Sequence, residues 1–137
     1  MFKHAFFSAQ PLAQYDSVYA ALRILTGLLM AYHGWEVFDA HQMGEYEKWL
    51  AEAKFPMPLF MAYLAKGAEL AAGISLTLGL WTRLGALATI LTMLGITFWL
   101  GNGKFWYGDQ HPFMFVMFGV LFFWGGPGKW SLDGRNG

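Results

Sequence analysis

The sequence contains no cysteine and few charged residues. Without cysteine, disulfides, iron–sulfur clusters, thiolate zinc sites and thiol catalysis are excluded within this chain. The formal net charge is zero, so the basic excess typical of nucleic-acid binding is absent and no nucleic-acid partner is expected. Charged residues make up only 13% of the 137 residues, whereas about a quarter is typical of soluble domains. This leaves too little polar surface to cover a water-exposed globule, and we expect lipid to cover part of it.

What the chain has instead is apolar and aromatic residues, at 56% and 19% of the sequence. Four apolar runs are candidate membrane spans: residues 18–35, 58–80, 84–100 and 112–125. A span takes about 20 residues, so the short fourth run requires its Gly/Pro-flanked ends or a locally thinner bilayer. The alternative is a soluble all-helical protein, which the uncharged third run and the Trp residues near the run ends argue against. We therefore predict an all-α membrane protein, a four-transmembrane-helix bundle forming a single domain over residues 1–137.

The connections between the runs are also informative. The tight turn at residues 80–83 predicts that the second and third helices are antiparallel neighbours. In the long first loop, four residues recur at helical spacing: Tyr46, Trp49, Leu50 and Ala53. This spacing predicts a short amphipathic helix over residues 45–53, lying in the membrane interface, with a solvated acidic loop as the alternative. The N-terminus has no apolar stretch of signal length before the first run, so that run is expected to be a retained span.

The orientation follows from the distribution of Lys and Arg around four spans, which place both termini on one side. Five basic residues belong to that side: Lys3, Arg23, Arg83, Lys129 and Arg135. Three belong to the other: Lys48, Lys54 and Lys104. Because cytoplasmic segments carry the excess of Lys and Arg, both termini are predicted to be cytoplasmic.

Ionisable side chains within the spans are costly to bury and need partners. Glu69 lies midway along the second run, and Lys66 precedes it by three residues, so the two side chains can touch. Arg23 enters the first run from the inner side and can reach towards Glu69 if the two helices are adjacent. His33 lies near the outer boundary, close to the depth of Lys66. We therefore predict a buried Arg23–Glu69–Lys66 cluster with His33 above it.

The predicted cluster has two competing interpretations. It is either a neutralised ion pair that fixes helix register or a binding site for a polar head group, such as a quinone carbonyl. A proton path is a weaker third reading, because two neighbouring cations favour an ionised carboxylate. The pattern His33-x-x-Glu36-x-x-Asp39-x-His41, joined by His111, is also a candidate metal site. Bundle metal sites need such motifs on two helices and further carboxylates, so an interfacial polar cluster is favoured and no metal is predicted.

Several segments in a fixed order resemble a known family. They are Leu22-Arg23-Ile24, Tyr32-His33-Gly34-Trp35, Phe55-Pro56-Met57-Pro58, Ala62-Tyr63-Leu64-Ala65, Glu69, Gly73, Gly79-Leu80-Trp81-Thr82-Arg83 and Gly126-Pro127-Gly128-Lys129-Trp130-Ser131-Leu132-Asp133. Over residues 18–133 the chain is similar to the DoxX family of small bacterial four-helix membrane proteins. The sequence departs from the expected pattern at Glu36, where a Gln or neutral residue is expected, and at the extra charge Lys66.

The resemblance implies an inner-membrane protein with a redox connection. The family takes its name from similarity to a membrane subunit of a thiosulfate:quinone oxidoreductase, and other members look like partners of oxidative-stress enzymes. The leading hypothesis is a redox-linked subunit that binds a quinone or similar lipophilic molecule in the bundle, with electrons supplied by a soluble or membrane partner. The alternative is a non-catalytic scaffold or assembly protein. Whether the chain belongs to an enzyme, and whether it forms a homo-oligomer, stays open at this stage.

Overall fold

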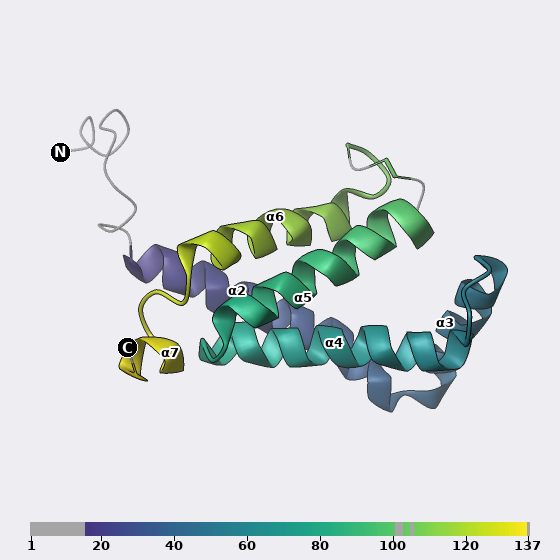
Figure 1. The fold of residues 1–137 in the computed structure, drawn as a ribbon, viewed down its shortest axis with the longest axis horizontal. Helices are drawn as coiled ribbons and strands as arrows, with labels where there is room; N and C mark the ends of the chain where they lie inside the picture. The colour runs from purple at the N-terminus through teal and green to yellow at the C-terminus, as the bar shows by residue number, and fades with distance from the viewer. Residues whose placement is uncertain (1–15, 101–102, 105, 137) are drawn as a thin grey trace.

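The computed structural model describes residues 16–100, 103–104 and 106–136 (Figure 1). Lys3, one of the basic residues used for the predicted orientation, lies outside the described residues. Four long helices correspond to the four predicted apolar runs: α2 (Asp16–Gly34), α4 (Pro58–Leu78), α5 (Thr82–Gly95) and α6 (Gln110–Gly125). A π-helix, η3 (Ile96–Leu100), extends α5, and three short helices complete the order: η2 (Trp35–Phe38), α3 (Ala40–Glu52) and α7 (Leu132–Asn136).

The four long helices pack in the order α2, α4, α5 and α6, and α2 also touches α6. The closest seam joins α2 to α4, where a Cβ on Gly73 would collide with the backbone of Ala31, and one on Gly27 with Thr77. Small residues let membrane helices approach this closely, since lipid provides no hydrophobic drive for their association. The face of α4 that carries Gly73 and Thr77 therefore points into the bundle.

The turn between α4 and α5 is tight and makes the two helices antiparallel neighbours, as expected. Gly79 ends α4 with φ 66°, a left-handed conformation that glycine adopts without strain. Trp81, with φ 51°, occupies the cap position of α5, and its own side chain makes no capping hydrogen bond. The N-terminus of α5 therefore depends on another segment for its acceptors.

The first loop folds as a helix, so the alternative of a solvated acidic loop is wrong. The helix is longer than predicted, because α3 begins at Ala40 rather than near residue 45. Its N-cap is Asp39, whose Oδ1 accepts hydrogen bonds from the backbone N–H groups of His41 and Gln42. Met43 and Leu50 are buried against the bundle.

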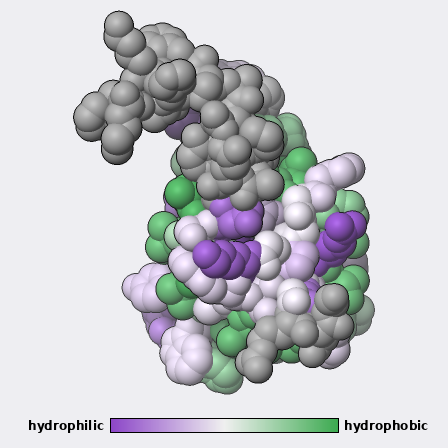
Figure 2. Space-filling view, turned by 90° about the vertical axis from the view of Figure 1, so that its left-hand side faces the viewer, coloured by the Kyte–Doolittle hydropathy of each residue, from purple (hydrophilic) through white to green (hydrophobic). Residues whose placement is uncertain are grey.

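The start of α2 and the C-terminal α7 lie at one end of the bundle, and η2 and α3 lie at the other (Figure 1). Figure 2 looks at the α7 end, where hydrophilic side chains gather between hydrophobic flanks. Large apolar side chains are exposed along the helices, including Leu25, Leu91 and Trp99. Pro58–Leu78 and Thr82–Leu100 are each long and apolar enough to cross a membrane, and Gln110–Gly125 is apolar but shorter. This surface suits lipid rather than water.

Candidate functional site: a buried lysine between carboxylates and cavities

The centre of the candidate site is the ammonium group of Lys66 on α4, which is buried. Its Nζ donates a hydrogen bond to Oε2 of Glu69 at 3.1 Å and lies 3.2 Å from Oε2 of Glu36. Glu69 is only 2% exposed. The predicted pairing of Lys66 with Glu69 is confirmed, and it follows from their spacing of three residues on one helix.

Glu36 and Tyr46 bring η2 and α3 into the same cluster. The Tyr46 hydroxyl donates to Oε2 of Glu36, and Lys66 Nζ lies 4.5 Å from the centroid of the Tyr46 ring. Burial opposes the charge on Glu36, but the hydrogen bond from Tyr46 and the charge of Lys66 outweigh it and lower the pKa of this carboxyl. Burial and the donation to Glu36 raise the pKa of Tyr46. Glu36 is therefore ionised and Tyr46 is neutral at physiological pH.

Arg23 does not join this cluster, so the predicted contact between Arg23 and Glu69 is wrong. The guanidinium is fully buried near the α7 end, where it donates to the carbonyl oxygens of Leu76 at 2.9 Å, Lys129 at 2.9 Å and Trp130 at 2.7 Å, and to that of Pro127. Leu76 belongs to the last turn of α4, whose carbonyls have no partner within the helix. Backbone carbonyl oxygens, and not a carboxylate, therefore accept these hydrogen bonds from the Arg23 guanidinium.

Asp133 holds the same end of the molecule together. Its carboxylate accepts hydrogen bonds from the backbone N–H groups of Trp81 and Thr82 and from the Thr82 hydroxyl, each at 2.9 Å. Burial raises the pKa of Asp133, but these donors and the charge of Arg23 together outweigh burial and hold the pKa below its ordinary value. The tail thus supplies the N-terminal cap that Trp81 cannot provide for α5.

His33 lies beside the lysine cluster, as predicted, and faces α6. Its ring centroid is 5.6 Å from that of His111 and 6.2 Å from that of Phe115. A cavity of about 120 Å³ is lined by His33, His111, Lys66 and Glu69, together with four apolar or proline residues.

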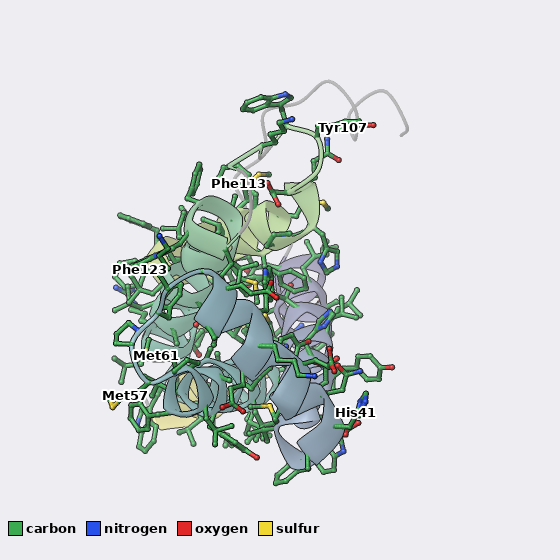
Figure 3. The ribbon with its side chains drawn as sticks, turned by 90° about the vertical axis from the view of Figure 1, so that its right-hand side faces the viewer. His41, Met57, Met61, Tyr107, Phe113 and Phe123 are labelled. Carbon is green, nitrogen blue, oxygen red and sulfur yellow. The ribbon has the colours of Figure 1, made fainter. Side chains whose placement is uncertain are left out.

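No group of three or more His, Asp or Glu residues among the described residues is placed to hold a metal ion. His41, from the pattern weighed as a metal site, is exposed and lies at the edge of the molecule (Figure 3).

Two further cavities adjoin the lysine cluster. The larger, of about 390 Å³, is almost entirely apolar and lies between α3, α4, α5 and η3. The smaller, of about 60 Å³, contains Tyr46, Lys66 and Glu69 in its lining, and it shares Leu50, Ala65, Ile96 and Leu100 with the larger one. Residues of η3 line both cavities, and π-helical segments occur frequently at functional sites. The arrangement places an apolar space beside a buried cation.

Sequence reasoning missed the roles of Glu36 and Tyr46, which contact Lys66 from other elements. Tyr46 was assigned only to the apolar face of the loop helix. A signal for Glu36 was available, because Glu36 and Lys66 were the two charges that departed from the expected family pattern. In the structure Glu36 and Lys66 form an ion pair, so the charge of each compensates for the charge of the other.

Fold and site together define a helical membrane protein with a polar cluster inside its bundle. Comparison with known proteins agrees: a profile of the DoxX family matches residues 18–102, more than half of the chain. The chain is also 30% identical over 132 residues to an uncharacterized membrane protein of Mycobacterium tuberculosis, covering 83% of this chain and 78% of that protein. No solved structure matches. The protein belongs to the DoxX family.

Proposed function

We propose that this protein is a redox-linked subunit of the bacterial inner membrane that binds a quinone or similar lipophilic molecule within its helix bundle. A partner protein, soluble or membrane-bound, supplies the electrons. The observation that supports the proposal is the small cavity lined by Lys66 and Glu69, which shares four lining residues with the apolar cavity of about 390 Å³. Sites for small molecules are typically apolar spaces with a few converging polar groups.

A quinone matches this combination chemically. Its tail is apolar, and its carbonyl oxygens accept hydrogen bonds. An ammonium group has three N–H donors, and in this cluster Glu69 and Glu36 account for two interactions of Lys66. In this proposal the third donor binds a carbonyl oxygen of the ligand in the smaller cavity, which Lys66 lines, and the ligand tail continues into the larger cavity. Lys66 and Glu69 therefore form the polar end of the proposed site, with Tyr46 and His33 beside it.

Arg23 has a different role from the one predicted for it. Its hydrogen bonds hold the tail and the end of α4, near the α7 end and away from the cavities. We assign Arg23 to the structure of the bundle rather than to the ligand site.

The four long helices act as four membrane spans in this proposal, with both ends of the described chain on the cytoplasmic side.

The proposal is tested by the quinone content of the purified protein. The full chain is solubilised in mild detergent, extracted with organic solvent and assayed for quinone per protein chain. We expect close to one quinone per chain in the wild type and a large loss in Ala65→Phe, because the new ring fills the space that both cavities share. Ala71→Phe is the matched control, since Ala71 is exposed on the same helix and lines neither cavity.

The rival function is a non-catalytic scaffold or assembly protein whose buried charges only lock the bundle. The carbonyl cluster around Arg23 is the observation that favours it, because there a buried charge has a purely structural role. The two functions differ in one outcome. A wild-type protein that carries no quinone, and takes up none when reconstituted with an excess, would support the scaffold and reject the quinone site.

A further inference from the structure

The outer end of α2 carries a second pocket that the quinone site does not use. A cavity of about 330 Å³ is lined by three aromatic and two acidic residues: Tyr32, Trp35, Glu36, Phe38 and Asp39. All three aromatic side chains are exposed, at 77% for Tyr32, 65% for Trp35 and 67% for Phe38. None of these three lines a cavity beside Lys66.

The pocket combines the two features that recognise an organic ammonium ion. Aromatic faces attract a cation through the ring quadrupole, and quaternary ammonium groups are bound in this way by aromatic cages. The Trp35 and Phe38 rings lie edge to face with centroids 4.9 Å apart, so they form a corner rather than a flat surface. Acidic residues at the rim then add a charge of the opposite sign.

Charge at this end of the bundle favours a cation even though Lys66 is near. Lys66 is shared between Glu36 and Glu69, so two carboxylates face one ammonium. Asp39 adds a further carboxylate, whose Oδ1 caps α3. Three carboxylates thus face one ammonium among these four groups, and two of the three, Glu36 and Asp39, line the pocket.

The position of the pocket indicates which kind of molecule carries the ammonium group. The pocket lies where α2 ends and the short helices η2 and α3 begin, which is the level of the lipid head groups for a helix crossing the bilayer. We propose that this pocket binds the ammonium group of a phospholipid head group, such as that of phosphatidylethanolamine or phosphatidylcholine. The lipid is held at the end of α2 opposite α7, and its binding does not depend on a quinone.

The test is a competition between lipids, read by native mass spectrometry of the full chain. The protein is mixed with equal amounts of phosphatidylethanolamine and phosphatidylglycerol that carry the same acyl chains. We expect the wild type to retain the ethanolamine lipid preferentially. Trp35→Ala should reduce that preference by about two- to fivefold, as expected for the loss of one exposed cation–π contact. Trp106→Ala is the matched control, because Trp106 is also exposed but lies outside the pocket.

A second pair of variants separates the pocket charge from general surface charge. Asp39→Asn removes the carboxylate but keeps a good N-cap for α3, and it should lower the preference for the ethanolamine lipid. Glu45→Gln removes one charge at an exposed position on α3 and should leave the preference unchanged. Equal retention of both lipids by the wild type would overturn the proposal, as would equal effects of Asp39→Asn and Glu45→Gln. Displacement of the lipid by soluble phosphoethanolamine at similar concentration would reject the lipid as the source.

Discussion

Arg23 and Lys66 are both buried cations in membrane helices, and their side chains are stabilised differently. Arg23 has five N–H donors, and its guanidinium is surrounded by backbone carbonyls from α4 and the tail. Lys66 is balanced by two carboxylates from η2 and α4. The difference matters for function because a carbonyl shell is fixed by the backbone, whereas side-chain carboxylates leave room for a ligand beside the charge.

Because Lys66 has two carboxylate partners, removing the charge of Lys66 should destabilise the protein more than removing the charge of Glu69. Lys66→Met leaves Glu69 buried without a cation and should lower the free energy of unfolding by about 3 to 5 kcal/mol. Glu69→Gln should cost less, about 1 to 3 kcal/mol, because Lys66 keeps Glu36 as a partner. Chemical unfolding in detergent micelles, followed by circular dichroism, measures both.

The double variant provides the control for this pair. Lys66→Met combined with Glu69→Gln should cost clearly less than the sum of the single changes, because neither buried charge is then left alone. Additive costs would show that the two side chains do not interact. A larger cost for Glu69→Gln than for Lys66→Met would show that Glu36 does not support Lys66.

At this scale the sequence predicted contacts within one helix but not between elements. Lys66 and Glu69 were paired because a spacing of three residues determines their proximity on any helix. The partners of Arg23 were not predictable in this way, because backbone carbonyls are present at every residue and only the fold decides which ones converge. The rule that a buried charge needs a partner was correct, but a carboxylate was the wrong partner for Arg23.

At the scale of the helices, the pattern of small residues identified the packing faces. Gly73 lies against α2 and Gly85 against Ser75 of α4, so both are at helix contacts. Gly95, on the same helix as Gly85, has open space around it and lines the apolar cavity. Small residues thus indicate either a close contact or a cavity, and the sequence alone cannot distinguish the two.

The α2–α4 seam predicts opposite effects for two glycines on one helix. Gly73→Ala places a methyl group into the backbone of α2 and should destabilise the protein by about 1 to 3 kcal/mol. Gly67→Ala has open space around the new methyl group and should stabilise by about 0.5 to 1 kcal/mol through helix propensity. Thermal unfolding of both variants checks this, and a harmless Gly73→Ala would show that the helices are not in close contact there.

At the scale of the whole molecule, the orientation in the membrane stays a prediction. The start of α2 and α7 lie at the same end of the bundle (Figure 1), and Lys and Arg are more numerous on the side of the termini by five to three. A reporter fused after Gly137 should be cytoplasmic, and one inserted near Glu45 should be external. Opposite locations would reverse the orientation, and reporters on the same side would reject four spans.

The C-terminal tail closes the bundle by joining helices that are distant in the sequence. Arg23 of α2 binds the carbonyls of Lys129 and Trp130, while Asp133 caps α5 and its own N–H bonds to the carbonyl of Gly79 at 2.8 Å. The tail, Gly126 to Asp133, was one of the segments that carried the family resemblance in the sequence. Its structural reason is this set of contacts, which connects α2, α4 and α5 at one end.

The tail contacts predict a stability that depends on pH through Asp133. The folded protein holds the pKa of this carboxyl below its ordinary value, so its contribution is complete above the pKa of the unfolded chain. The contribution is lost as the pH falls from the ordinary pKa of an Asp, about 4, through the lowered pKa of the folded state. Asp133→Asn should therefore lower stability by about 1 kcal/mol at pH 7, because the amide keeps one acceptor oxygen but loses the second oxygen and the negative charge at the N-terminus of α5.

Unfolding curves of the wild type and Asp133→Asn across this pH range measure the effect. The two proteins should differ at pH 7 and converge towards pH 2, because the protonated wild-type carboxyl no longer acts as an anionic cap. Glu52→Gln, a change at an exposed position on α3, should follow the wild type throughout. A constant difference between Asp133→Asn and the wild type at every pH would show that the shape of the side chain, and not its charge, holds the tail against α5.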